Sequence, residues 1–506
     1  MPTALLLALA SDAGGGPACL LPAGETTILS RLVHQVVGHA EVVVVTRSAW
    51  KEAVSAAVGV PKALNDVGVI AVHDRADLLR LLSNAPEGRI AMLPGDVIAS
   101  DLAVGRVTDR GATRTAVLGA TPDQPGVSAQ GWPLRVTRGR VVAAGSHIHR
   151  VHAPTHRSLD AWCVAATDRE ALTAAADDVG RLLATGGLEL DVSEDSLELV
   201  PPTLLVALVR RGVAVALTPL PSGAVWSRPT TRGQAASAAT AAAEVDEDRV
   251  RLDAAVKAED GFFTTFFVST YSRYWARSAA RAGVTPDQVT VASMGLGVAA
   301  AIAFAWGTTA GAVVGAVALQ LAFTLDCVDG QLARYTRNFS IFGAWLDSIF
   351  DRGKEYAVYA GLAVGGVRAG GDTELWWFAA ALLAMQTFRH TVDLGYVEQQ
   401  RRDLAREVRR PLTVVGESGT GFWEPAPAVP VATLPQRVIG WLRRAEAVPA
   451  LKWLKRIVVL PIGERFALIS VLAITSGPRT VFLVLLTWGA LATSYTVGGR
   501  VVRSIA

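Results

Sequence analysis

Four aspartates lie in two closely spaced pairs in the second half of the chain, at spacings that match the turns of an α-helix. Asp326 and Asp329 lie at positions i and i+3, and Asp347 and Asp351 lie at i and i+4. Residues three or four apart share one helix face, so each pair forms an acidic stripe. Two such stripes on adjacent helices repel unless cations neutralise them, and carboxylate oxygens suit Mg²⁺ or Mn²⁺. The sequence therefore predicts a divalent-metal site between two helices.

Small residues and an arginine accompany these aspartates. Gly330 and Ala333 lie on the first predicted helix, and Gly343 lies on the second. Small side chains let a neighbouring helix or a ligand approach the backbone closely. Arg334 adds a fixed positive charge of the kind that binds phosphate. In an alternative interpretation, the aspartates only pair with basic residues near the helix ends: Arg337, Arg352 and Lys354.

The elements that must position these residues are predicted to be membrane helices. Residues 288–325 contain no Asp, Glu, Lys, Arg or His and are interrupted only at Gly307-Thr308-Thr309. Because a spanning helix needs about 20 apolar residues, this run predicts two helices joined by a turn. Apolar density predicts four further spans: Ile341–Val367, Leu375–Tyr396, Leu460–Ser476 and Thr480–Gly499. The second half is thus expected to be an all-α domain with six transmembrane helices.

Basic residues predict how these helices are oriented. They flank the turn between the second and third spans and fill the connection before the fifth: Arg334, Arg337, Arg352, Lys354, Arg401, Arg402, Arg406, Arg409, Arg410, Arg443, Arg444, Lys452 and Lys455. Positive charge marks the cytoplasmic side, so a multi-pass protein of the cell membrane is expected, with the acidic motif and both termini in the cytoplasm. Within residues 433–458, apolar Val438, Trp441, Leu442, Leu451 and Trp453 alternate with basic residues, which predicts a helix lying on anionic lipid.

Composition indicates two unlike halves. The chain has 506 residues, of which 51% are hydrophobic and 18% charged, with a formal net charge of +3. This length exceeds the roughly 250–300 residues at which single cores stop growing. The low charged fraction argues against disorder, and the near balance of charge argues against a nucleic-acid binder.

The first half alternates short β-rich runs with helix-length segments. The β-rich runs are Ala4–Ala10, Glu41–Thr46, Val67–Val72, Arg89–Leu93 and Leu204–Leu217, and the helical segments include Thr27–Val37 and Asp168–Ala184. This alternation predicts a Rossmann-like α/β domain, with a parallel sheet covered by helices, over residues 1–230. Residues 231–260 are expected to be a linker with a polar helix, and residues 261–506 the membrane domain.

The full acidic motif resembles the signature of the CDP-alcohol phosphatidyltransferase family, and the resemblance covers about residues 260–506. It implies an enzyme that cleaves the pyrophosphate of a CDP-linked alcohol, releases CMP and joins the remaining phosphoryl group to an acceptor hydroxyl. It further implies that Asp326, Asp329, Asp347 and Asp351 hold two Mg²⁺ or Mn²⁺ ions and that Asp351 is the general base. The implied CDP site comprises Asp326, Gly330, Ala333, Arg334 and Gly343. A homodimer among membrane lipids is also implied.

Two further arginines are candidates for binding a phosphate on the acceptor. Arg389 lies within the predicted fourth span, and Arg465 lies at the start of the fifth. Arginine inside a bilayer is costly and is therefore usually functional. In the alternative interpretation, Arg389 pairs with Asp393 and Arg465 pairs with Glu464.

The first half resembles, more loosely, a sugar-phosphate nucleotidyltransferase. The resemblance rests on the strand Ala4–Ala10, the Gly-rich loop Ser11–Gly16 and the strand-end segment Leu93-Pro94-Gly95-Asp96, in which Asp96 is the expected metal ligand. The loop arginine and the following lysine of such enzymes are missing, and residues 223–233 contain no acid. Without these groups triphosphate charge would be poorly neutralised. We therefore expect a degenerate or regulatory domain rather than an active cytidylyltransferase.

The fusion of these two halves resembles bifunctional enzymes that make CDP-inositol and then form di-inositol phosphate. Relatives without the fusion use CDP-diacylglycerol. Two hypotheses therefore stay open: transfer of a phospho-polyol from a soluble CDP-alcohol such as CDP-inositol, and transfer of a phosphatidyl group to a polyol or polyol phosphate. A non-catalytic membrane scaffold would require a broken motif, and the motif is intact.

Overall fold

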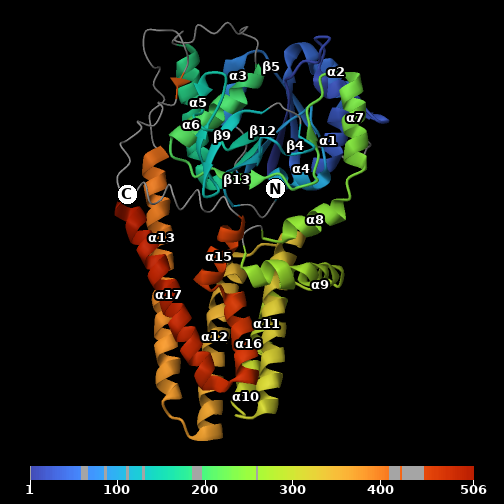
Figure 1. Cartoon of the computed structure of the whole chain (residues 1–506). Helices are drawn as coiled ribbons and strands as arrows, with labels where there is room; N and C mark the ends of the chain where they lie inside the picture. The colour runs from blue at the N-terminus through green and yellow to red at the C-terminus, as the bar shows by residue number, and fades with distance from the viewer. Residues whose placement is uncertain are drawn as a thin grey trace. The chain divides into compact units, whose positions relative to one another are not determined.

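The computed structural model describes residues 2–58, 67–84, 88–109, 113–127, 131–184, 197–257, 260–408, 422–423 and 449–505. The chain divides into two units (Figure 1). The N-terminal unit comprises Met1–Arg251 and Arg401–Ala428, and the helical unit comprises Leu252–Gln400 and Val429–Ala506.

A nine-stranded sheet forms the centre of the N-terminal unit, in the order β5-β4-β1-β6-β12-β8-β13-β10-β9. The strands are β1 (Thr3–Ala8), β4 (Glu41–Arg47), β5 (Gly68–Val72), β6 (Ile90–Pro94), β8 (Ala116–Ala120), β9 (Pro133–Thr137), β10 (Arg140–Ala144), β12 (His156–Val164) and β13 (Ala216–Pro219). The first four in the order are parallel, as predicted, but β12 runs antiparallel to both β6 and β8. The sheet is therefore mixed, because the chain returns through β12 without a crossover helix.

One predicted strand is mostly a helix. Of the predicted run Leu204–Leu217, the first part belongs to α6 (Val200–Arg210), and only the end lies in β13. All residues from Val200 to Val209 are buried. An apolar run that is buried on every side has no polar face, so its periodicity does not distinguish a helix from a strand. The prolines Pro201 and Pro202 in the first helical turn were the usable signal.

The segment predicted to be a linker is largely helical. It contains α7 (Arg232–Ala243) and α8 (Glu247–Ala255). The buried face of α7 consists of alanines, which pack with Ala18, Ile28 and Ile98 of the N-terminal unit. The Ala-rich composition is therefore explained by a close helix contact.

The helical unit contains helices at all six predicted spans (Figure 1). Its helices are α9 (Ser269–Arg281), α10 (Pro286–Phe304), α11 (Thr309–Thr336), α12 (Ile341–Gly370), α13 (Leu375–Val408), α15 (Pro449–Val459), α16 (Ile462–Thr475) and α17 (Gly477–Ile505). Side-chain caps fix where three of them begin: Thr285 caps α10, Thr308 caps α11 and Ser340 caps α12. The core between them contains Phe304, Phe323 and Phe466.

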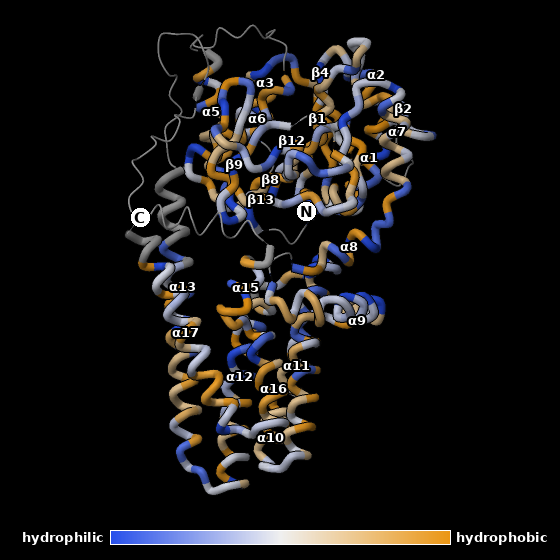
Figure 2. Tube along the Cα trace, in the orientation of Figure 1, coloured by the Kyte–Doolittle hydropathy of each residue, from blue (hydrophilic) through white to orange (hydrophobic). Residues whose placement is uncertain are grey.

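Among the described residues, three helices are long and apolar enough to cross a membrane: Pro286–Phe304, Thr309–Thr336 and Gly477–Val501. A fourth candidate is the pair Trp453–Val459 and Ile462–Thr475, whose axes meet at 66°. Figure 2 shows hydrophobic residues along α16. Large apolar side chains also face outward from the helices, among them Ile302, Val317, Trp377, Val471 and Leu491. Outward-facing apolar side chains on long helices are typical of membrane association.

Amphipathic helices lie at one end of the helical unit. In Figure 1, α9 runs across the ends of α10 and α11 rather than along them. Exposed aromatic residues lie on and just before α9, including Tyr271, Tyr274 and Trp275. The predicted lipid-surface helix at 433–458 falls partly outside the described residues, including Val438, Trp441 and Leu442; its end forms part of α15.

Candidate active site

The turn between α11 and α12 brings the acidic stripes together. α11 ends at Thr336, and its C-cap residue Arg337 adopts the left-handed conformation with φ 57°. The chain reverses, and the Ser340 Oγ accepts a hydrogen bond of 2.7 Å from the backbone N–H of Gly343 at the start of α12. Both α11 and α12 pack against α10, and the reversal leads the chain from the end of α11 directly into the first turns of α12. This geometry positions the first pair of aspartates against the second.

Three of the four predicted aspartates form one cluster. Ligand oxygens of Asp326, Asp329 and Asp347 all lie within 4.8 Å of one another. Asp329 is only 4% exposed, and its Oδ2 accepts a 2.7 Å hydrogen bond from the Thr290 hydroxyl on α10. Three converging carboxylates, one of them oriented by a hydroxyl, fit a hard divalent cation.

The fourth aspartate faces a lysine. The Asp351 Oδ1 lies 3.1 Å from the Lys354 Nζ, which also contacts the Asp326 Oδ1 and donates a 3.0 Å hydrogen bond to the Ser293 Oγ. The Lys354 side chain is 1% exposed. Of the basic residues that the alternative interpretation named, Lys354 thus does pair with the acidic motif. The orientation prediction counted Lys354 among the basic residues at the membrane surface. Its side chain instead lies inside the helical unit.

The two glycines of the motif have polar groups close to where a side chain would begin. A Cβ at Gly330 would lie 3.3 Å from the Arg334 Nη1, and a Cβ at Gly343 would lie 2.3 Å from the Asp287 Oδ1. The Arg334 Nε donates to the backbone carbonyl of Ala255, which fixes the guanidinium beside Gly330. Ala333 is half-buried on the same helix.

The two candidate acceptor arginines have different surroundings. Arg465 is 6% exposed, and its Nε and Nη2 lie 3.0 and 3.2 Å from the carboxylate of Glu355. The Arg389 Nη2 donates to the carbonyl of Val459 at 2.8 Å, while its buried Nη1 has no hydrogen-bond partner among the described residues. Neither arginine forms the carboxylate pair that the alternative interpretation named, because Asp393 contacts Arg500 and Glu464 accepts from the backbone N–H of Phe263.

Sequence reasoning missed a buried network below the aspartates. Glu355 also accepts hydrogen bonds from the Tyr359 hydroxyl and, at 3.1 Å, from the Gln386 Nε2. Glu355 is 1% exposed. The signal was available, because Asp347, Asp351, Glu355 and Tyr359 continue one i+4 stripe along α12.

In the N-terminal unit, Asp96 is held by an arginine. The Arg228 Nε and Nη2 donate to both Asp96 oxygens at 2.9 and 3.1 Å, and its Nη1 donates to the Asp160 Oδ2 at 2.8 Å. Burial alone would lower the pKa of Arg228, but the two carboxylates raise it, while burial raises the pKa of Asp160. The Gly-rich loop is also internally satisfied: Asp12 Oδ1 accepts 2.8 Å hydrogen bonds from the backbone N–H groups of Gly14 and Gly16.

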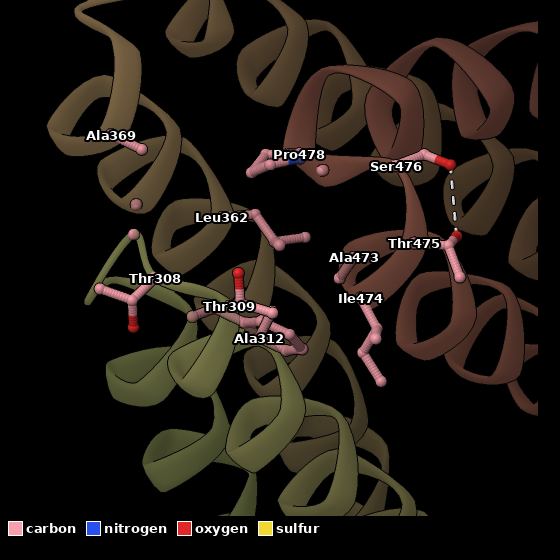
Figure 3. Close-up of a pocket in the computed structure, with 14 residues that line it drawn as sticks. Thr308, Thr309, Ala312, Leu362, Ala369, Ala473, Ile474, Thr475, Ser476 and Pro478 are labelled. Atoms are coloured by element: carbon pink, nitrogen blue, oxygen red, sulfur yellow. Dashed lines mark hydrogen bonds between the residues drawn. The ribbon is translucent and has the colours of Figure 1, made fainter.

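A cavity of about 220 Å³ lies elsewhere in the helical unit (Figure 3). Thr308 and Thr309 at the start of α11, Ala369 near the end of α12, and Thr475 and Ser476 between α16 and α17 line it. At 1.5 Å per residue, Thr309 is about 25 Å along α11 from Asp326. The cavity is therefore separate from the acidic cluster.

Residues 283–417 match the family model described as CDP-alcohol phosphatidyltransferase. The C-terminal half contains a CDP-alcohol phosphatidyltransferase domain. The matched residues include the acidic cluster, its turn and Arg389. They also include Lys354, Glu355 and Gln386 of the buried contacts described above.

Two curated relatives match this chain over part of their own length. The "Bifunctional IPC transferase and DIPP synthase" of Aquifex aeolicus (strain VF5) is 35% identical over 96 residues, which cover 19% of this chain and 21% of that protein. The "Phosphatidylinositol phosphate synthase" of Mycolicibacterium smegmatis is 37% identical over 117 residues, which cover 22% of this chain and 44% of that protein. The chain therefore spans less than half of either relative.

A solved structure of the inositol-1-phosphate CTP transferase from T. maritima overlaps 49% of this chain and 97% of its own, with 12% identity and a TM-score of 0.35.

Proposed function

We propose that the protein is an integral-membrane CDP-alcohol phosphotransferase. An acceptor hydroxyl attacks the phosphorus of the alcohol-linked phosphate in a CDP-alcohol donor, a new P–O bond forms, and the pyrophosphate P–O bond breaks so that CMP leaves with the bonding electrons. The observation that carries this proposal is the convergence of Asp326, Asp329 and Asp347 within 4.8 Å, inside the segment that matches the family. Divalent cations bound there would neutralise the developing negative charge on the leaving CMP.

The chain's own residues divide the remaining tasks. Asp351 takes the acceptor's proton as the last carboxylate of the motif, and the Lys354 ammonium 3.1 Å from its Oδ1 positions it for this role. Arg334 binds donor phosphate, because Ala255 holds its guanidinium beside Gly330. The proposed CDP site comprises Asp326, Gly330, Ala333, Arg334 and Gly343. The fit of Mg²⁺ or Mn²⁺ rests on the all-oxygen donor set.

We assign the acceptor phosphate first to Arg389. Its Nη1 is buried without a hydrogen-bond partner among the described residues, so a phosphate oxygen would satisfy it. Arg465 is less available, because Glu355 already neutralises it. A polyol phosphate is therefore the acceptor class that this site favours.

The donor has two candidates. A soluble CDP-alcohol such as CDP-inositol is favoured by the α/β unit that precedes the transferase domain. CDP-diacylglycerol is favoured by the similarity to the M. smegmatis relative and by the outward-facing apolar side chains of the helices. For the N-terminal unit we propose a degenerate or regulatory role, since Arg228 occupies both oxygens of Asp96.

We further propose that α10, α11, α12, α13, α16 and α17 form six membrane spans, with the acidic cluster on the cytoplasmic side. The opposite ends of the helices support this orientation, because the turns at residues 304–309, 367–375 and 475–480 contain only two basic residues, Arg368 and Arg479. We also propose a homodimer. The proposed domain boundaries are 1–230 for the α/β domain, 231–260 for the linker and 261–506 for the membrane domain.

The test is CMP release by purified protein with Mg²⁺, inositol phosphate, and either CDP-inositol or CDP-diacylglycerol. We expect release with one donor, none with EDTA, and donor binding without turnover for Asp351→Asn. Asp372→Asn, at the other end of α12, is the matched control and should keep wild-type turnover. Activity in EDTA would refute the role of the metal, and no release with either donor would refute the substrate proposal.

A further inference from the structure

Lys354 occupies a place in the acidic motif that a cation would otherwise fill. Its ammonium contacts Asp326 and lies 3.1 Å from Asp351, and it donates to Ser293 at 3.0 Å. Its side chain is 1% exposed, so bulk water does not separate the ammonium from these carboxylates. Gly297 on α10 makes room for the lysine, since a Cβ there would lie 2.6 Å from the Lys354 Cγ. The lysine stem is therefore packed against α10 inside the helical unit.

The aspartates thus divide into two sets. The three carboxylates that converge within 4.8 Å, Asp326, Asp329 and Asp347, make one cation site without the lysine. A second divalent ion would need Asp351 together with the shared Asp326, and these are the two carboxylates that the ammonium joins. A divalent ion bound between the same two oxygens would lie a few ångströms from the ammonium and would be repelled by it.

We propose that Lys354 is a resident cation in the second metal position, so that the protein without donor binds one divalent ion per chain, at Asp326, Asp329 and Asp347. This inference rests on the proposed metal-dependent function and deepens it: a second ion would enter only with the donor, whose pyrophosphate brings the negative charge and oxygen ligands that the ammonium otherwise offsets. Lys354 is then a positioning residue that sets the order of metal loading.

The experiment measures Mn²⁺ binding to the metal-stripped full-length protein in detergent, by equilibrium binding and electron paramagnetic resonance, with no nucleotide present. Wild type should bind one Mn²⁺ per chain, with the hyperfine pattern of an isolated ion. Lys354→Met should bind two, with the spectrum of an exchange-coupled pair, because two ions in one such site lie about 3.5–4 Å apart. Lys51→Met, which removes the same charge from an exposed helix of the N-terminal unit, should behave as wild type.

A second variant guards against misfolding of Lys354→Met. Gly297→Ala keeps the lysine but pushes its stem away from the cluster, so it should also gain a second ion. Two ions or none in the wild type, or a folded Lys354→Met or Gly297→Ala that still binds one, would overturn the proposal. None of these readouts requires turnover. A protein that releases no CMP but shows the expected stoichiometries would refute the proposed reaction and leave the role of Lys354 intact.

Discussion

Replacing Glu355 by Gln tests whether the pair of Glu355 and Arg465 supports the helical unit. The carboxylate is 1% exposed and the guanidinium 6%, and two of their atom pairs lie 3.0 and 3.2 Å apart. Removing one partner of a buried ion pair leaves an uncompensated charge and costs about 3–5 kcal/mol. For a unit of this size, about 1 kcal/mol lowers the melting temperature by roughly 2–4 °C, so a loss of roughly 6–20 °C is expected.

The assay is thermal unfolding in detergent, followed by thiol-reactive dye or intrinsic fluorescence. The matched control is Glu374→Gln, whose carboxylate is 65% exposed and lies 3.4 Å from Arg479; an exposed pair contributes about 0–1 kcal/mol. The double variant Glu355→Gln/Arg465→Gln removes both charges and should recover at least half of the lost stability. If Glu355→Gln unfolds at the same temperature as Glu374→Gln, or if the double variant is no more stable than Glu355→Gln, the reasoning is refuted.

The double variant also separates two roles of Arg465. If this arginine only balances Glu355, the restored protein should keep the wild-type KM for the phosphorylated acceptor. A raised KM for the acceptor with an unchanged KM for the donor would instead place Arg465 in the acceptor site.

Three further predictions concern single side chains. Arg389→Gln should raise the KM for a phosphorylated acceptor at least tenfold while leaving donor binding unchanged; an equal effect on both substrates would contradict its assignment. Burial and the charge of Arg75 lower the pKa of His147 to about 4, so the folded N-terminal unit resists protonation that the unfolded chain accepts below about 6.5. The free energy of unfolding of this unit should therefore fall as the pH is lowered from 6.5 to 4. At pH 5 the loss should be at most about 2 kcal/mol, and nearer about 1 kcal/mol because solvent screens the partly exposed ring. Denaturant titrations of His147→Gln should no longer show this pH dependence. Arg228→Ala should leave Asp96 and its partner carboxylate uncompensated, cost about 3–5 kcal/mol and speed hydrogen exchange in β6 and β12; unchanged exchange would show that the guanidinium is dispensable.

The sequence was most informative where spacing and helix geometry coincide. The acidic pairs, the break before Thr309 and the turn before Gly343 follow from periodicity and local capping, so they were predictable. The direction of β12 and the helical state of Val200–Val209 were not, because buried apolar runs have no polar face and strand direction is a long-range property.

Pairing partners were the least predictable part of the site. Near neighbours in sequence suggested Glu464 for Arg465 and Asp393 for Arg389, but the partner of Arg465 comes from another helix. Which charges meet in a helical bundle depends on the rotation of each helix about its axis, and local sequence does not fix that rotation. Lys354 was named as a partner only in the alternative interpretation, and it lies three residues after Asp351 on the same helix.

The internal contacts of the N-terminal unit have a consequence for its dependence on small molecules. A protein that binds a ligand only when folded gains stability in proportion to the logarithm of ligand concentration. Here Asp12 supplies the anion to the Gly-rich loop, and Arg228 supplies the cation to Asp96. Because the polypeptide carries both counter-ions itself, the proposed degenerate role predicts that added nucleotide and magnesium leave the stability of this unit unchanged. The unit would then stay folded when the nucleotide concentration in the cell falls, whereas a domain that depends on bound nucleotide would lose stability.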